Sequence, residues 1–343
     1  MKTSSEKERS KIRLSELHNA AVNRTRRTVV NFDVMIVQYA ESDEYSPEEL
    51  LKQRMEFADN PDTTIDSIWW NWSDGNVAAF PSKLQPQLNL PSFKKWWKDD
   101  IDIVDIFDNE TRKRGIESFY SHRMNGSDND PMYVPEIGLL LDGVLQNRED
   151  SEIFITESDA GDSDQANYSI PMKVANPHWL FNLPWISNGV WNYAIQEVRD
   201  HTLSKLREIA ENYSFDGIEL DFARGFVFPP GTGWENRSLL TKFIYDVRKM
   251  TLEIEEKRGK AFLLATRIPE KIVGCHFDGI DPESWAKDRL VDIFTLGARS
   301  FDVDVGDFRK ITENIPIKIY PVLDDHHSCD AYCTPPIEVF RGV

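Results

Sequence analysis

Short runs rich in β-branched and aromatic residues alternate with helical patterns along most of this chain, and that alternation limits the folds open to it. Seven such runs occur, at residues 28–35, 65–72, 116–123, 215–222, 261–268, 291–296 and 317–323. Strands that alternate with helices are typical of parallel βα units. The sequence therefore predicts an α/β fold built on parallel strands.

Helical patterns separate these runs. Ser46-Pro47 is typical of a helix start, and Gly115 of a helix end directly before the third strand. Further helices are expected at about residues 101–114, 190–212, 238–258, 282–287 and 305–313. Residues 126–189, after the third strand, are too many for an ordinary loop and too aromatic for a linker, so we expect an inserted region there.

Repeated right-handed βα units close most naturally into a (β/α)8 barrel of the TIM type. Residues 324–343 are too few for a further helix and strand, so the barrel is expected to lack its eighth βα unit. A doubly wound open sheet is the alternative, but no GxGxxG turn follows the first strand to support a nucleotide site. We expect residues 1–27 to form a charged leader, either mobile or a poorly packed helix, and residues 28–343 to form one barrel domain.

The net charge of the chain argues against some functions. Lys and Arg number 40 against 58 Asp and Glu, a formal net charge of −18. Nucleic-acid binding is not expected, because neutralising phosphates needs a basic face. Nor is a membrane partner, because no apolar run reaches the roughly 18 to 20 residues that span a bilayer. Residues 1–20 are charged and unlike a signal peptide, and the three cysteines lack the spacing of a zinc site or a disulfide framework.

The fourth predicted strand carries three acidic residues, Asp216, Glu219 and Asp221, among apolar ones. Side chains alternate along a strand, so Glu219 and Asp221 share one face and Asp221 lies nearer the carboxyl end. In a barrel this face is the interior and this end is the mouth where substrates bind. The two carboxylates are therefore candidate catalytic groups, and the alternative is a salt-bridged pair that stabilises the barrel. Asp216 has the opposite register and is expected to cap or turn.

Four arginines lie at or just beyond the carboxyl ends of the third to sixth strands: Arg123, Arg224, Arg267 and Arg299. Because guanidinium groups bind carboxylate and sulfate groups bidentately, an anionic substrate is one explanation of this arginine rim. The alternative is that at least two of these arginines pair with neighbouring acids such as Asp221.

Other residues at the strand ends complete a candidate site. Glu270, beyond the fifth strand, offers the second carboxylate that glycoside cleavage needs. An indole face and directional hydrogen-bonding groups suit a sugar ring, and the candidate substrate contacts of this kind are Trp70, Asn71, His122, Asn125, Asp324 and His326. The adjacent His326 and His327 point to opposite sides of an extended chain, so neither a metal site nor a cofactor is predicted. The insertion's aromatics, Trp191 and Tyr193 among them, form either a wall of the mouth or a small core of their own.

Four runs together resemble the glycosyl hydrolase-like 10 family of TIM-barrel proteins: residues 121–125 (SHRMN), 176–179 (NPHW), 191–200 (WNYAIQEVRD) and 215–224 (FDGIELDFAR). These largely uncharacterised proteins are common in polysaccharide-degrading bacteria. The similarity covers residues 28–325 and implies a barrel that acts on a polysaccharide in an extracellular or periplasmic location.

The fourth strand is also similar to the chitinase pattern DGxDxDxE, but Ala223 replaces the final acid, which argues against chitinase chemistry. The endo-fucanases of glycoside hydrolase family 168 resemble the chain more closely, with a carboxylate on the fourth strand and a later glutamate as the pair. That resemblance implies Asp221 as nucleophile and Glu270 as acid/base, and the arginine rim would suit sulfate.

The sequence thus predicts a glycoside hydrolase that cleaves O-glycosidic bonds of a polysaccharide, with sulfated or uronic chains as the anionic candidates, by a retaining two-carboxylate mechanism. Glu219 would hold Asp221 or a substrate hydroxyl. The first alternative is a non-catalytic carbohydrate-binding or incomplete barrel protein, and the second is a metal-dependent hydrolase that uses His326 and His327.

Overall fold

The computed structural model describes residues 12–34, 46–72, 76–87, 91–126, 132–134, 138–141, 144–146, 170–183, 186–223, 225–297, 302–323, 326–327 and 332–333. The chain divides into two compact units. Unit 1 comprises Met1–Thr25 and Gly217–Val343, and unit 2 comprises Arg26–Asp216. No helix in the described part of the chain combines the length and apolar character that crossing a bilayer requires.

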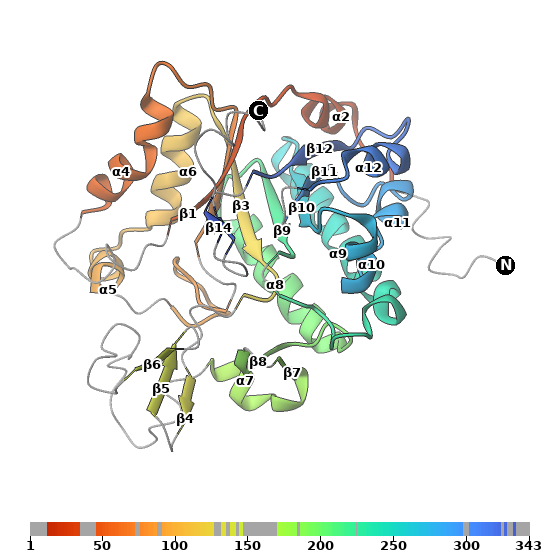
Figure 1. Ribbon diagram of the computed structural model, residues 1–343. Coiled ribbons are helices and arrows are strands. Elements are labelled where there is room, and N and C mark those ends of the chain that lie inside the picture. Colours follow the sequence, from red (N-terminus) through yellow and green to blue (C-terminus); the bar gives the residue numbers. More distant parts are fainter. Residues whose placement is uncertain are drawn as a thin grey trace. The chain divides into compact units, whose positions relative to one another are not determined.

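Unit 2 contains three strands that pair in parallel in chain order, β1 (Val29–Asp33), β2 (Ser67–Asn71) and β3 (Glu117–Arg123). Its longer helices are α4 (Pro47–Asp59), α5 (Pro91–Lys98), α6 (Ile103–Lys113) and α8 (Gln196–Asn212). Helices α4 and α6 lie beside these strands (Figure 1). The contact is aromatic: Phe32 stacks on Phe57 of α4, and the ring of Trp70 meets Phe107 of α6 edge to face at 5.2 Å.

Local sequence signals explain where these helices begin and end. Ser46 and Glu49 form a capping box at the start of α4, in which each side chain accepts a hydrogen bond from the other's backbone N–H. Asp102 caps α6 by accepting hydrogen bonds from the backbone N–H groups of Val104 and Asp105. Gly115, with φ of 72°, turns the chain from α6 into β3 in a left-handed conformation that favours glycine.

The region between β3 and α8, where an insertion is expected, contains in its described part short antiparallel strands and two short helical segments: β4 (Met132–Val134), β5 (Gly138–Leu141), β6 (Val144–Gln146), α7 (Pro171–Ala175), the 3-10 turn Pro177–Trp179, β7 (Leu180–Leu183) and β8 (Ile186–Trp191). Trp191 and Tyr193 are buried, 2% and 0% exposed. These two aromatics therefore belong to a core and do not form an open wall.

Unit 1 contains four parallel strands, again paired in chain order: β9 (Gly217–Asp221), β10 (Leu263–Ile268), β11 (Ile293–Leu296) and β12 (Lys318–Pro321). Its helices after β9 are α9 (Gly233–Arg258), α10 (Ile272–Asp278), α11 (Pro282–Lys287) and α12 (Val305–Ile311) (Figure 1). Phe294 of β11 packs against Phe308 of α12, which identifies the face of the strands that the helices cover. Two short antiparallel strands follow, β13 (His326–His327) and β14 (Tyr332–Cys333).

Residues 12–25 of the predicted charged leader are part of unit 1. They contain α2 (Glu16–Asn23), which is capped by the Ser15 side chain and buries His18 and Val22. The sequence did not predict that this segment packs into unit 1, because a helix with only two buried positions gives no clear apolar periodicity.

All seven predicted strands are present among the described residues, each shorter than predicted by one to three residues at its ends. The parallel α/β organisation is therefore confirmed, while the described residues contain no eighth parallel strand. Helix α8 begins later than expected because residues 186–191 form β8, α9 begins five residues earlier, and α5, α7 and α10 were not predicted.

Candidate active site

Two carboxylates, separated by one residue, lie on one face of β9. Glu219 and Asp221 are 1% and 3% exposed, and the residues between and before them, Leu220 and Ile218, point to the opposite face. The shared face predicted for the two acids is confirmed. Because an ionised carboxylate is costly to bury, this face must supply polar partners.

The strand register supplies those partners. Asp221 is paired with Arg267 of β10, Arg267 with Thr295 of β11, and Thr295 with Tyr320 of β12. Paired positions in parallel strands share a face, so these four side chains form one polar row across unit 1 near the carboxyl ends of its strands. We call Asp221, Arg267, Thr295, Tyr320 and the adjacent Glu219 the polar row.

Asp221 is held through both of its carboxylate oxygens. Its Oδ1 accepts a hydrogen bond from the backbone N–H of Ala223 at 2.7 Å, and its Oδ2 lies 3.9 Å from Nη1 of Arg267. Arg267 is fixed in turn, because its Nε donates to the carbonyl oxygen of Gly297 at 3.0 Å. The guanidinium group therefore acts as an ion-pair partner of Asp221, as the alternative reading of the arginine rim expected.

The side chain of Thr295 on β11 contacts both β9 and β10. Its hydroxyl lies 3.1 Å from Oε1 of Glu219 and 3.1 Å from the carbonyl oxygen of Thr266. Thr295 was not among the predicted site residues. It lies in the predicted strand at residues 291–296, where strand alternation puts it on the same face as Val291 and Ile293. Strand alternation alone could have placed it; only the register shows that it meets Glu219.

Thr295→Val is expected to lower the free energy of unfolding by about 1 to 2 kcal/mol, because it removes a hydrogen-bond donor from a buried carboxylate. The matched control is Thr266→Val on the neighbouring strand, since the buried Thr266 hydroxyl has no hydrogen-bond partner within the described residues. That control is expected to be neutral or slightly stabilising. Urea unfolding of both variants measures the difference, and equal effects would contradict the role given to Thr295.

Glu270 lies two residues beyond the end of β10 and is half-buried. Its backbone carbonyl accepts a hydrogen bond from the N–H of Asp304 at 3.0 Å, and the next residue, Lys271, forms an ion pair with Asp302. These contacts tie the segment after β10 to the segment before α12. Glu270 is thus placed in the same unit as Asp221, at the carboxyl end of the adjacent strand.

Unit 2 has a polar row of its own on β1, β2 and β3. Asp33, Asn71 and Ser121 occupy paired positions, and Asn71 donates to the carbonyl oxygen of Ser121 at 3.2 Å. Arg123, two residues further along β3, has Nη2 2.5 Å from Oδ2 of Asp33. Like Arg267, Arg123 therefore pairs with an acid.

Asn125 lies just beyond β3 and is 2% exposed. It exchanges two hydrogen bonds with the backbone of Trp191, at 2.9 and 3.0 Å, and the Trp191 indole donates to Asn76 at 2.7 Å. This network joins the end of β3 to the inserted region. Asn125 is engaged in structure here, and we leave it out of the proposed site.

Trp70 and His122 lie on the helix-facing side of β2 and β3. The Trp70 indole is fully buried and donates to the hydroxyl of Thr111 on α6 at 3.0 Å, so it offers no face to a sugar. His122 is 2% exposed, and burial together with the charges of Lys205 and His201 holds its pKa well below the usual range. We leave both residues out of the proposed site as well.

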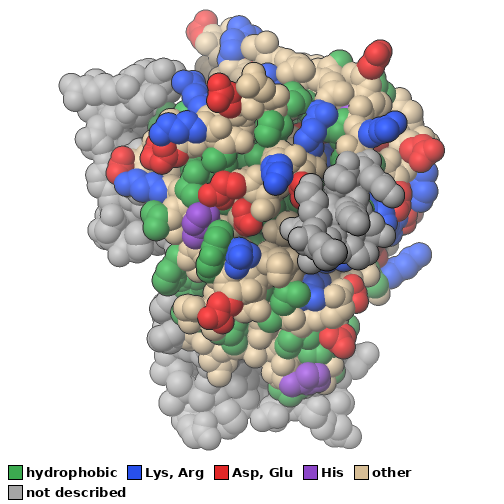
Figure 2. All heavy atoms as spheres, turned by 90° about the vertical axis from the view of Figure 1, so that its right-hand side faces the viewer, with side chains coloured by type: hydrophobic (Ala, Val, Ile, Leu, Met, Phe, Trp, Pro, Cys, Tyr) green, Lys and Arg blue, Asp and Glu red, His purple; other side chains and the backbone are tan. Residues whose placement is uncertain are grey.

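Three of the predicted site residues, Arg224, Arg299 and Asp324, lie outside the described residues, and His326 is described only as part of β13. Over the described part of the chain, no three His, Cys, Asp or Glu side chains are grouped as a metal site. On the face in Figure 2, basic, acidic and hydrophobic side chains are intermixed.

Comparisons with known proteins give remote structural similarity. No family model and no curated protein sequence matches the chain. Solved structures that match include a glycoside hydrolase family 18 N-acetylglucosaminidase from Paenibacillus barengoltzii, at 12% identity and a TM-score of 0.38 over 81% of this chain and 54% of that one. A chitinase from Bacillus thuringiensis matches at 11% identity and a TM-score of 0.42, over 81% of this chain and 40% of that one.

A family 36 alpha-galactosidase variant from Geobacillus stearothermophilus matches at 12% identity and a TM-score of 0.37, over 92% of this chain and 42% of that one. The chain thus spans about half the length, or less, of these three structures. These three proteins are an N-acetylglucosaminidase, a chitinase and an alpha-galactosidase, but similarity this remote says nothing of the chemistry of the present chain.

Proposed function

We propose that this protein is a glycoside hydrolase that cleaves O-glycosidic bonds of a polysaccharide with Asp221 and Glu270 as its two working carboxylates. The observation that carries the proposal is the polar row: two buried carboxylates on one strand face, in register with Arg267 and Thr295. Acids buried at the carboxyl ends of parallel strands are costly to stability, and a catalytic role explains why they are there.

In the proposed mechanism Asp221 attacks the anomeric carbon while Glu270 donates its proton to the leaving oxygen, which breaks the glycosidic bond and leaves a glycosyl ester on Asp221. Water then attacks the anomeric carbon, Glu270 takes the water's proton back, and Asp221 is released as a carboxylate. The Ala223 N–H and Arg267 fix the two oxygens of Asp221 for attack. Glu219, held by Thr295, positions Asp221 or a substrate hydroxyl.

The anionic substrate that the arginine rim suggested has less support than the hydrolase itself. Arg123 and Arg267, the two rim arginines that the structure describes, are paired with Asp33 and Asp221. A sulfated or uronic polysaccharide therefore stays in the proposal as one of the substrates to be tested.

The test is release of reducing ends from a panel of neutral, uronic and sulfated polysaccharides. We expect release from at least one member of the panel, and the product formed first should keep the anomeric configuration of the substrate, observed by proton NMR. Inverted product would replace the retaining route by an inverting one. No release from any member, with a folded protein that still binds a polysaccharide, would favour the carbohydrate-binding alternative.

A further inference from the structure

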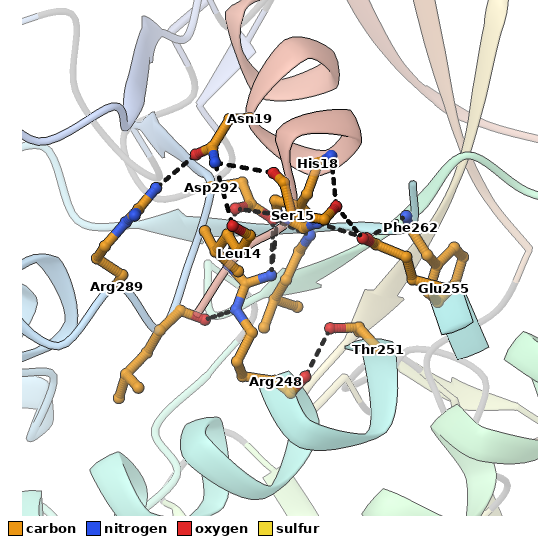
Figure 3. Close-up of polar contacts among 12 residues, drawn as sticks. Leu14, Ser15, His18, Asn19, Arg248, Thr251, Glu255, Phe262, Arg289 and Asp292 are labelled. Atoms are coloured by element: carbon orange, nitrogen blue, oxygen red, sulfur yellow. Dashed lines mark hydrogen bonds and ion pairs between the residues drawn. The ribbon is translucent and has the colours of Figure 1, made fainter. Parts of the chain in front are cut away.

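His18, the third residue of α2, lies at the centre of a buried group of charges in unit 1. Its hydrogen-bond partners are Glu255 of α9 and Asp292, which directly precedes β11, and Arg248 of α9 lies 3.5 Å from its Nε2. Figure 3 shows these side chains converging beneath α2. His18 is fully buried, and Arg248 and Asp292 are 0% and 1% exposed.

The hydrogen bonds of His18 determine its protonation. Nδ1 lies 2.5 Å from Oε2 of Glu255, and Nε2 lies 2.9 Å from Oδ1 of Asp292. An ionised carboxylate only accepts hydrogen bonds, so both ring nitrogens must donate, and only the imidazolium form has two N–H donors. The pKa points the same way: although burial would lower it, hydrogen bonding and charge from Asp292 raise the pKa of His18 above its usual value.

The other contacts of the cluster show that the positive charge of His18 is needed to balance its carboxylates. Asp292 also forms ion-pair and hydrogen-bond contacts of 2.7 and 2.9 Å with Arg248, and its Oδ2 accepts the backbone N–H of Leu264 at 2.8 Å. Glu255 accepts from the hydroxyl of Ser15 at 2.8 Å. The cluster thus balances two cations, His18 and Arg248, against two carboxylates, and a neutral His18 would leave one buried negative charge in excess.

We propose that His18 is a proton-controlled clasp: with both ring nitrogens protonated it fastens α2 to α9 and to the start of β11, and loss of one proton releases α2. The charged groups that face His18 are Glu255, Asp292 and Arg248. Arg248 Nη1 lies 3.5 Å from Nε2 of His18 and already donates to Oδ2 of Asp292 at 2.9 Å, so Arg248 is not a spare cation that could replace the protonated histidine. Hydrogen bonds between Asn19 and Arg289 and between Ser15 and Glu255 remain, but they do not offset a buried excess charge.

The sign of the pH dependence follows from the direction of the shift. The pKa of His18 is raised in the folded chain from 6.5, so its stabilising contribution is complete below pH 6.5 and is lost as pH rises through the folded-state pKa. Between these two values, opening of α2 releases one proton. The opening equilibrium should therefore increase by up to about tenfold per pH unit and then level off.

Hydrogen exchange of the full chain, corrected for intrinsic rates, tests this between pH 6 and 10. We expect the protection of the α2 amides to fall by up to about tenfold per pH unit above pH 6.5 while that of the β10 and β11 amides falls less. Nitrogen-15 NMR of the imidazole at pH 6.5 should show protons on both ring nitrogens. A neutral ring at that pH, flat protection of α2, or an equal fall throughout unit 1 would each overturn the proposal.

His18→Gln keeps a polar side chain but loses the charge, so α2 should be less protected at pH 6.5 and its protection should not depend on pH. The matched control is His276→Gln, because His276 is half-exposed and paired with Glu283 in the same unit. The control should keep the pH dependence of the unaltered chain. If His18→Gln kept that dependence, the proton would belong to another group and the clasp would be refuted; if the variant does not fold, the measurements on the unaltered chain decide.

Discussion

Asp221→Asn is expected to reduce the release of reducing ends by at least about 1,000-fold, because an amide is a far poorer nucleophile than a carboxylate. The fold should survive. Asparagine keeps an oxygen that accepts the Ala223 N–H, and Arg267 keeps its hydrogen bond to the carbonyl of Gly297. We expect the free energy of unfolding to change by no more than about 1.5 to 3 kcal/mol, the range for hydrogen bonds to charged groups.

The matched control for this prediction is Asp246→Asn. Asp246 lies on α9 in the same unit, partly exposed and paired with Lys242, away from the polar row. It should keep the full rate of hydrolysis. Retention of more than a tenth of the rate by a folded Asp221→Asn protein would remove Asp221 from the nucleophile's role.

Arg248→Met is expected to destabilise unit 1 by about 3 to 5 kcal/mol, the range measured when one member of a buried ion pair is removed. The substitution leaves Asp292 and Glu255 facing His18 as their only cation in the cluster, and it also removes the hydrogen bond from Nε to the carbonyl of Leu290. The pKa of Asp292 is held well below its usual range against the effect of burial, chiefly by the charge of Arg248. Loss of Arg248 therefore removes the largest contribution that stabilises this buried negative charge.

Urea unfolding measures this loss, and Lys242→Met is the control on the same helix. The exposed Lys242–Asp246 pair should contribute no more than about 0.5 kcal/mol. Arg248→Met combined with Asp292→Asn should cost less than the sum of the two single variants, because the second change removes the charge that the first leaves unbalanced. A cost below about 1 kcal/mol for Arg248→Met would show that the cluster is not energetically coupled as described.

Strand alternation explains both a correct and an incorrect part of the site prediction. It placed Glu219 and Asp221 on one face, and the structure agrees. The same rule puts Trp70 and Asn71 on opposite faces, so the two could not both contact a substrate on one side of the strands. The structure resolves the choice: Trp70 packs under α6, and Asn71 is on the face of Asp33 and Ser121.

For the arginine rim, the sequence could not decide which groups the arginines bind. The sequence placed four arginines at the ends of predicted strands, and it offered two readings, anion binding and pairing with acids; Arg123 and Arg267 are the two that the structure describes. For Arg123 and Arg267 the partners are Asp33 and Asp221, residues 90 and 46 positions away. Side-chain pairing at such separations depends on strand register, and periodicity carries no information about register.

The sequence by itself determined the elements of this protein, because helix caps, glycine turns and the two-residue period of strands are set by neighbouring residues. It therefore predicted seven parallel strands and the shared face of two acids. Only the tertiary structure decided which charges meet: Thr295 reaches Glu219 across 76 positions, and His18 reaches Asp292 across 274. Such contacts form when folding removes water from groups that are distant in the chain, and their charges then have to balance in a medium that stabilises them poorly.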